Sequence, residues 1–299
     1  MPPTVLAIFG PTGVGKTAVA LTLAARLRVE GEDPVAVSAD ALQVYRGLGV
    51  LTGAASPAEQ QRLEHRLIAF RDPEAPFSAG EYARLAHQEI DGLLAAGRRP
   101  IVVGGTGLYL RAALADLDLR PPVATAIRTR RRAQLDRHGA AALHEELAAR
   151  APAAAAAVKP GDSQRVVRAL ELLDAGHEPP SGDQLWTSTT RHPTLLAGLT
   201  MEREALKQRI DERIDAMLAA GVEDEVRAAD ARGATATVRK ALGFRELLAG
   251  DVDQMRRSTH RYARRQLTWM RKLPGVHLVD VTGREPDDVA AEIHEALRA

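Results

Sequence analysis

The sequence lacks cysteine, and none of its 299 residues carries a thiol. This absence excludes disulfide bonds, zinc sites with thiolate ligands, iron–sulfur clusters and cysteine nucleophiles. The sequence also lacks an apolar run long enough to cross a bilayer as a helix, so we expect no membrane partner. Its first residues contain no basic segment and no small-residue cleavage site, which leads us to expect a cytoplasmic protein.

An excess of charge of one sign is also missing, because 40 lysines and arginines are balanced by 39 aspartates and glutamates. Hydrophobic residues make up 45% of the chain and charged residues 26%, as in globular proteins. A net charge of +1 does not exclude a nucleic-acid partner, since the distribution of the cations matters more than their sum. Aromatic residues amount to 3%, and we expect Tyr45, Tyr109, Phe244 and Trp269 to be core rings.

Strands and helices alternate at both ends of the chain, which is typical of an α/β fold with a parallel sheet. Short apolar runs predict strands at residues 4–9, 34–38, 101–103, 195–199 and 276–281. Helical spacing of apolar residues predicts helices at residues 16–27, 81–95, 202–220 and 286–299.

The middle of the chain differs, because residues 121–180 contain Ala- and Arg-rich helical stretches and no strand-like run. Proline pairs bound this segment at both ends. We therefore assign residues 1–120 and 190–299 to an α/β core and residues 121–189 to an all-helical insertion domain.

The strongest motif is a glycine-rich loop between the first strand and the first helix, and it matches the pattern G-x-x-x-x-G-K-[ST]. Its residues are Gly10-Pro11-Thr12-Gly13-Val14-Gly15-Lys16-Thr17. Backbone N–H groups and a helix N-terminus face a phosphate chain in such a loop. Lys16 supplies a positive charge, and the Thr17 hydroxyl is placed to bind Mg²⁺. The motif predicts a P-loop NTPase-like core, but it does not identify the ligand as ATP.

Two polar residues follow the next two predicted strands, at the edge where open parallel sheets bind ligands. Asp40 is compatible with three roles: holding Mg²⁺ through water, accepting a proton from a nucleophile, or capping a helix. Thr106 follows the Gly104-Gly105 pair and is compatible with a helix cap or with catalysis. The residue types alone leave these roles open.

Arginines gather in two clusters. Arg128, Arg130, Arg131 and Arg132 open the insertion, and residues 256–272 carry seven cations without an acid. Acids normally alternate with cations on a solvated helix face, so their absence favours a polyanion partner. As a helix, the second segment places Met255, Tyr262 and Trp269 in one stripe opposite Arg257, Arg261, Arg264 and Arg265.

These motifs together resemble the bacterial tRNA dimethylallyltransferase family, also called tRNA isopentenyltransferases or IPP transferases. The resemblance covers nearly the whole chain in order, and the chain departs from the family pattern at Ala41 and at residues 51–56. The matching residues are 10–17 (GPTGVGKT), 40–45 (DALQVY), 72–79 (DPEAPFSA), 103–109 (VGGTGLY), 164–168 (QRVVR), 243–246 (GFRE) and 264–271 (RRQLTWMR).

The resemblance implies transfer of a dimethylallyl group from dimethylallyl diphosphate to N6 of the adenosine 3′-adjacent to the anticodon of tRNA. It implies diphosphate binding by residues 10–17, Mg²⁺ held by Thr17 and Asp40, and catalysis by Asp40, Thr106 and Arg203. Because the N6 amine is a weak nucleophile, Asp40 is the candidate base that removes its proton. The family also implies a monomer that binds an anticodon stem-loop. The implied tRNA-binding residues are Asp40, Ala41, Leu42, Gln43, Thr106, Arg128, Gln164, Arg165, Arg168, Arg245, Arg261, Arg264 and Arg265.

Three alternatives use the same motifs. A small-molecule P-loop kinase explains the glycine loop and Asp40, but not the acid-free helix. An adenylate isopentenyltransferase that acts on free nucleotides does not need that helix either. An RNA-binding module switched by a nucleotide explains the basic residues, but it gives Asp40 and Thr106 no role.

Overall fold

The computed structural model describes residues 5–180 and 184–298. Thr4 and Ala299, where we predicted a strand to begin and a helix to end, lie outside the described residues. The chain divides into two compact units, residues 1–116 with 188–299, and residues 117–187. The predicted division, after residues 120 and 189, lies within a few residues of these points.

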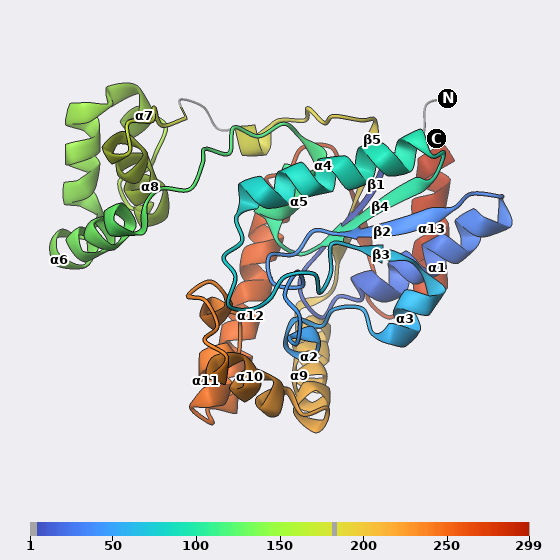
Figure 1. Ribbon diagram of the computed structural model, residues 1–299. Coiled ribbons are helices and arrows are strands. Elements are labelled where there is room, and N and C mark those ends of the chain that lie inside the picture. Colours follow the sequence, from blue (N-terminus) through green and yellow to red (C-terminus); the bar gives the residue numbers. More distant parts are fainter. Residues whose placement is uncertain (1–4, 181–183, 299) are drawn as a thin grey trace. The chain divides into compact units, whose positions relative to one another are not determined.

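The first unit is built on a six-stranded parallel sheet with the strand order β3-β2-β4-β1-β5-β6 (Figure 1). The strands β1 and β2 are mainly apolar and fully buried, as expected for a sheet covered on both faces. The strand β3 has only two residues and gave no sequence signal. The bounds are β1 Val5–Phe9, β2 Pro34–Ser38, β3 His65–Arg66, β4 Arg99–Gly104, β5 Thr194–Thr200 and β6 Val276–Asp280.

Two pairs of helices cover the sheet. Helix α1 (Lys16–Val29) packs against α13 (Pro286–Arg298), while α4 (Ala79–Ala95) packs against α5 (Gly107–Leu114). Figure 1 shows the two pairs on opposite sides of the sheet. Helix α4 begins with a capping box between Ser78 and Glu81, which satisfies N–H groups at its start.

The remaining helices of this unit follow β2 and β5. The connection from β2 to β3 contains the short helices α2 (Gly49–Thr52) and α3 (Pro57–Arg62). After β5 the chain forms α9, whose predicted apolar face is confirmed by the burial of Leu206, Ile210 and Ile214. The bounds are α9 Arg203–Ala219, α10 Val222–Ala231, α11 Phe244–Leu248 and α12 Val252–Met270.

The second unit forms helices and no strand among its described residues. These are α6 (Thr125–Arg150), α7 (Pro152–Ala156) and α8 (Ser163–Asp174). Helix α6 is interrupted at Gly139, where φ is 77°. Leu143 and Leu147 of α6 pack with apolar residues of α7 and α8 in a separate small core.

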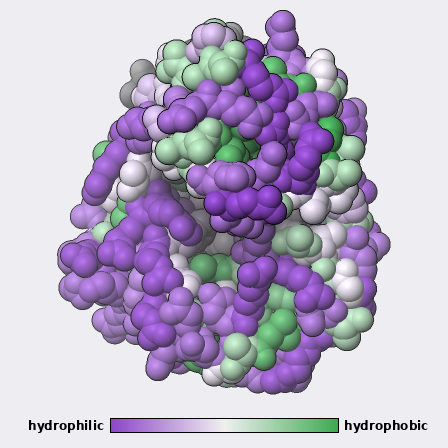
Figure 2. All heavy atoms as spheres, turned by 90° about the vertical axis from the view of Figure 1, so that its left-hand side faces the viewer, coloured by the Kyte–Doolittle hydropathy of each residue, from purple (hydrophilic) through white to green (hydrophobic). Residues whose placement is uncertain are grey.

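Apolar side chains are largely withdrawn from the surface. Hydrophilic residues cover most of the face drawn in Figure 2, and the exposed large apolar side chains of the described residues are Val29, Leu248 and Leu278. No helix in residues 5–180 or 184–298 is long and apolar enough to cross a membrane. Tyr45, Tyr109 and Phe244 are buried as predicted.

Candidate active site

The glycine-rich loop lies at the carboxyl end of β1 and leads directly into α1. Gly13 and Gly15 have φ values of 83° and 98°, a conformation that side chains rarely adopt. A Cβ on Gly13 would also come within 2.9 Å of Ile210 on α9. No side chain caps the start of α1, so its first N–H groups face the loop as an anion site.

Lys16 is folded back onto its own loop. Its Nζ donates hydrogen bonds to the carbonyls of Gly10 and Pro11 at 3.0 and 2.9 Å. Burial, reinforced by the positive charge of Arg213, lowers the pKa of Lys16 to about 7. An anion in the loop would stabilise the charged form and attract the ammonium group away from these carbonyls.

Asp40 lies at the carboxyl end of β2 and directs one oxygen toward each of two neighbours. Its Oδ1 accepts a hydrogen bond from the Leu42 N–H at 2.9 Å, and its Oδ2 accepts one from the Thr106 hydroxyl at 3.3 Å. Burial raises the pKa of Asp40, while the Leu42 N–H and the charge of Lys16 act in the opposite direction.

The role of helix cap is wrong for Asp40. Turns follow this residue, and the next helix, α2, begins only at Gly49. The hydrogen bond from the amide two residues on to the Asp40 carboxylate forms an Asx turn. The Gln43 amide is used within the same segment, where it accepts from the Ser38 hydroxyl and donates to the Gly53 carbonyl.

Thr106 occupies the N-cap position of α5, but its hydroxyl makes no capping hydrogen bond. It donates to Asp40 instead. Gly104 permits this approach, because a Cβ there would lie 2.1 Å from the Ala39 carbonyl oxygen. The parallel order β2-β4-β1 therefore brings Asp40, Thr106 and the glycine loop to one edge of the sheet.

Arg213 of α9 is a site residue that the sequence analysis missed. Burial lowers its pKa, and the nearby carboxylate of Asp40 opposes that effect. Gly53 lies beside it, since a Cβ at this position would fall 1.6 Å from Arg213 Nη2. One sequence signal was available. Arg213 follows Ile210 by three residues, so the two side chains are neighbours on α9, and Ile210 lies beside Gly13 of the glycine loop.

Arg203, predicted to be catalytic, lies in the first turn of α9. Its side chain is 69% exposed and approaches Glu204 at 3.9 Å. It precedes Arg213 by ten residues, which is about 15 Å along a helix axis. Arg209 and Arg213 are thus the α9 arginines near Gly15 and Gly53, respectively.

The predicted apolar stripe of α12 is displaced. Met255 is buried, but the buried positions then run through Thr259, Ala263, Gln266 and Met270. Tyr262 and Trp269 are half-buried on the flank, because a spacing of seven drifts about 20° per repeat on a straight helix. Burial and the charge of Asp40 raise the pKa of Tyr262 to about 12, while a hydrogen bond with Thr106 opposes the shift.

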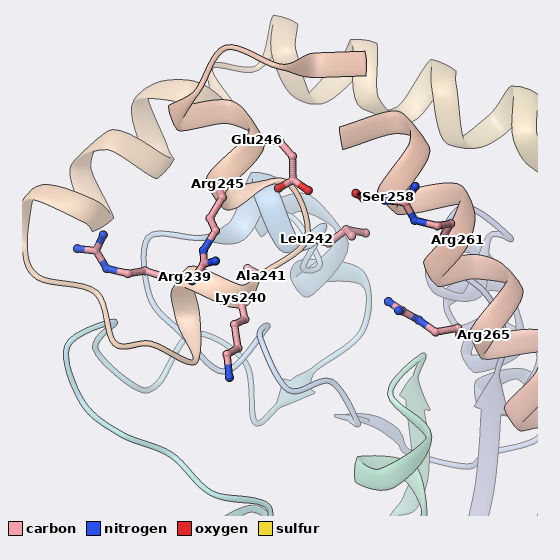
Figure 3. Close-up of a pocket in the computed structure, with 9 residues that line it drawn as sticks. All are labelled: Arg239, Lys240, Ala241, Leu242, Arg245, Glu246, Ser258, Arg261 and Arg265. Atoms are coloured by element: carbon pink, nitrogen blue, oxygen red, sulfur yellow. Dashed lines mark hydrogen bonds between the residues drawn. The ribbon is translucent and has the colours of Figure 1, made fainter. Parts of the chain in front are cut away.

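Several cations of α12 and the preceding segment surround one hollow, which we call the basic pocket. Arg261 and Arg265 enter it from α12, and Lys240 and Arg245 line it from the other side (Figure 3). Arg239 also lines it, but its guanidinium points away and pairs with Asp230. The pocket has a volume of about 320 Å³ and contains one carboxylate, that of Glu246.

Other arginines of α12 have different neighbours. Arg256 forms ion pairs with Asp211 and Asp215 of α9, so acids missing from residues 256–272 are supplied by another helix. Arg264 is exposed and lines a second groove together with Arg203 and Lys207.

The arginine cluster of the second unit is largely neutralised. Arg131 is buried and pairs with Asp174 at 2.6 Å and Glu146 at 2.8 Å, and Arg130 also binds Asp174. Arg130 and Arg131 are therefore held by acids of the second unit, and the prediction of tRNA binding in this cluster concerns Arg128. Arg128 is exposed on α6.

The polar residues of α8 make contacts within the second unit. Arg165 lies 3.6 Å from Asp162. Arg168 donates to the carbonyls of Arg120 and Pro121 and pairs with Glu171. Gln164 is exposed beside them, so tRNA binding by this group stays a prediction.

Residues 43–273 match the family model described as IPP transferase. The chain is 37% identical to the tRNA dimethylallyltransferase of Geobacillus thermodenitrificans, covering 98% of this chain and 95% of that one. It is 40% identical to the same enzyme of Symbiobacterium thermophilum, covering 95% and 92%. The crystal structure of the tRNA isopentenylpyrophosphate transferase of Bacillus halodurans superposes with a TM-score of 0.71 at 33% identity, covering 99% and 95%.

Proposed function

The chain belongs to the IPP transferase family, and on that premise we propose that it is a tRNA dimethylallyltransferase. It transfers the dimethylallyl group of dimethylallyl diphosphate to N6 of the adenosine 3′-adjacent to the anticodon and releases diphosphate. The observation that carries this proposal is the meeting of the loops that follow β1, β2 and β4. There Asp40 accepts a hydrogen bond from Thr106 close to the charge of Lys16.

The glycine loop suits the diphosphate of the donor. Its uncapped N–H groups and the N-terminus of α1 attract the anion, and diphosphate oxygens replace the Gly10 and Pro11 carbonyls as acceptors for Lys16. The Arg213 guanidinium adds a second charge near the loop. These groups stabilise the negative charge that develops on the leaving diphosphate as the allylic C–O bond breaks.

Asp40 suits the role of general base. The N6 nitrogen attacks the allylic carbon, the C–O bond to diphosphate breaks, and the proton of N6 passes to the Asp40 carboxylate. Burial raises the pKa of this carboxyl, which makes the ionised form a stronger base. The Thr106 hydroxyl fixes the orientation of the Asp40 carboxylate, and we propose that it also contacts the diphosphate.

We propose Mg²⁺ as the cofactor. Residues 5–180 and 184–298 contain no group of three histidine or acidic side chains that could hold a metal. Asp40 and Thr17 instead fit an ion that arrives with diphosphate, because Mg²⁺ keeps several waters and takes few protein ligands beside phosphates. When bound, it would neutralise charge on the leaving group.

The basic pocket suits the phosphates of the anticodon stem-loop. Its cations outnumber its single carboxylate, which favours RNA backbone over a small neutral substrate. The target adenosine must leave its stack to reach the donor, and phosphate contacts can hold the RNA while it does. A kinase or an adenylate isopentenyltransferase would give this pocket no role. We further propose that the enzyme acts as a monomer in the cytoplasm.

The experiment is an incubation of the protein and Mg²⁺ with an anticodon stem-loop and radiolabelled dimethylallyl diphosphate. We expect label in the RNA at the adenosine next to the anticodon, and none in a stem-loop that carries guanosine there. Label in free adenine nucleotides alone, or phosphoryl transfer from ATP in a parallel reaction, would contradict the proposal.

A further inference from the structure

Gln266 of α12 joins two loops that are far apart in sequence. Its side chain is buried, with 5% of its surface exposed. Its Oε1 accepts a hydrogen bond from the Thr12 N–H at 2.8 Å, and its Nε2 donates one to the Gly105 carbonyl at 2.7 Å. One amide therefore connects the glycine loop after β1 with the loop that carries Thr106.

The chemistry of both contacts requires a primary amide at this distance. Thr12 N–H needs an acceptor and Gly105 C=O needs a donor, and a glutamine side chain supplies one of each. Glutamate can accept but not donate, while leucine can do neither. Burial makes either loss costly, since an unpaired backbone group there forfeits its solvation.

Gly105 is small because this amide passes next to it. A Cβ on Gly105 would lie 2.4 Å from Gln266 Nε2, and 3.4 Å from Lys16 Nζ. One turn along α12, Trp269 covers Gly107 so closely that a Cβ there would lie 2.2 Å from its ring. The glycines of the segment VGGTGLY and two side chains of RRQLTWMR are therefore complementary parts of one contact.

We propose that Gln266 is a positioning residue that holds the diphosphate loop and the Asp40–Thr106 pair in the relative arrangement needed for transfer. Both polar atoms of the Gln266 side chain are used by backbone groups of the two loops. Gln266 acts through Thr12 on one side and through the backbone before Thr106 on the other. The claim that Gln266 affects transfer rests on the function proposed above. The claim that Gln266 holds the two loops together does not.

The first test measures the loops without using activity. Hydrogen–deuterium exchange is followed in peptides covering residues 10–15 and 104–108 of Gln266→Leu, with Gln254→Leu as the matched control on the same helix. The Gln254 side chain bonds to Arg257 and Ser258 of its own helix. We expect exchange in both peptides to become about tenfold faster in Gln266→Leu and to stay unchanged in the control. Unchanged exchange in Gln266→Leu would overturn the proposal, whether or not the protein transfers a prenyl group.

The second test separates positioning from a general loss of stability. Single-turnover transfer to an anticodon stem-loop is measured for Gln266→Leu, Thr106→Ala and the double variant. If Gln266 acts through Thr106, its substitution slows the wild type about 10- to 100-fold but slows Thr106→Ala much less. Gln266→Glu, which keeps only the contact with Thr12, should lie between glutamine and leucine. Equal losses in both backgrounds would show that Gln266 does not act through Thr106, and would overturn the proposed coupling of the two loops.

Discussion

Charged side chains are withdrawn from solvent in two regions of this molecule, with opposite consequences. In the second unit, ion pairs with Arg131 and two neighbouring arginines hold the pKa of Asp174 well below its ordinary value, and these pairs raise the pKa of Arg131. At the edge of the sheet, burial lowers the pKa of Lys16 and raises that of Asp40.

The difference lies in the completeness of the pairing. Asp174 receives hydrogen bonds from Arg130, Arg131 and Arg150 at 2.6 to 2.9 Å, so its charge is fully compensated within the protein. Lys16 donates only to carbonyls, and Asp40 receives only neutral donors. Buried groups whose charge is not compensated by an opposite charge at hydrogen-bond distance respond strongly to a charged ligand, which is typical of functional sites.

The largest effect on rate should come from Asp40→Asn, which removes the base and keeps its shape. We expect single-turnover transfer to fall by about 10²–10⁴-fold, with little change in the dissociation constants of RNA and donor. Stability at neutral pH should not fall. A raised pKa in the folded state means that the ionised carboxyl costs folding free energy above that pKa, and asparagine removes the cost.

Two results would change the assignment of Asp40. A rate close to wild type would remove the general-base role. A loss of donor affinity that excess Mg²⁺ restores would show that Asp40 acts chiefly on the metal.

Asp174→Asn should have the opposite effect to Asp40→Asn: it should lower the stability of the protein rather than the rate of transfer. Removing one partner of a buried ion pair costs about 3–5 kcal/mol, because Arg131 remains buried with only Glu146, which is partly exposed, as its counter-charge. This loss is measured by urea unfolding, monitored by hydrogen–deuterium exchange in peptides of α6 and α8. The wild-type contribution should also disappear as pH falls below about 4, since the carboxylate is ionised in the folded state at lower pH than in the unfolded chain. Equal stability of variant and wild type would contradict the comparison of the two regions.

The next effect, smaller than the two above, is on the affinity for diphosphate. This affinity should depend on pH through the protonation of Lys16. With a pKa of about 7 in the free protein, Lys16 is increasingly neutral as pH rises above 7, so binding must take up a proton. Affinity should therefore fall with rising pH, by up to about tenfold per unit for one proton. Calorimetry between pH 6.5 and 9 measures the slope.

Lys16→Ala is the control for that titration. This variant should bind diphosphate more weakly and should bind RNA with nearly the wild-type affinity. The part of the pH dependence of diphosphate affinity that comes from Lys16 should disappear. An identical slope in both proteins would assign the proton to the ligand.

The smallest effect per residue should come from the exposed cations of α12. Replacing Arg261, Arg264 and Arg265 by alanine should weaken RNA binding and flatten its salt dependence by about 0.7–0.9 per lost phosphate contact. Filter binding between 50 and 300 mM salt measures the change, and Arg256→Ala, which breaks ion pairs with α9, serves as a matched control. An unchanged salt slope in a folded triple variant would mean that this face is only solvated.

Features carried by local sequence were predicted well. The run PVAVS gave β2 with its observed bounds, because an apolar segment between turn residues is itself the signal. The glycine loop and the helix after it were equally local. Arg213 and Gln266 were missed because their partners are distant: Gly53 for the first, Thr12 and Gly105 for the second.

Charge surfaces were predicted less well for a related reason. The absence of acids along residues 256–272 says nothing about acids on neighbouring helices, and Asp211 and Asp215 supply them for Arg256. The cluster at residues 128–132 likewise gave no sign that Arg131 is buried, because its partners Glu146 and Asp174 come from later in the chain. A cation's role depends on its tertiary neighbours, which spacing does not reveal.

The strand order also has a consequence for synthesis of the chain. β1 lies between β4 and β5, so one of its edges can pair once residue 104 has been made, while the other waits for the strand that begins at Thr194. At translation rates of about 5–20 residues per second, the apolar edge of β1 stays open for roughly 5–20 s while the helical unit emerges. Unpaired apolar edges are templates for association with other chains. The nascent protein is therefore most exposed to aggregation, and to chaperone binding, during translation of its insertion.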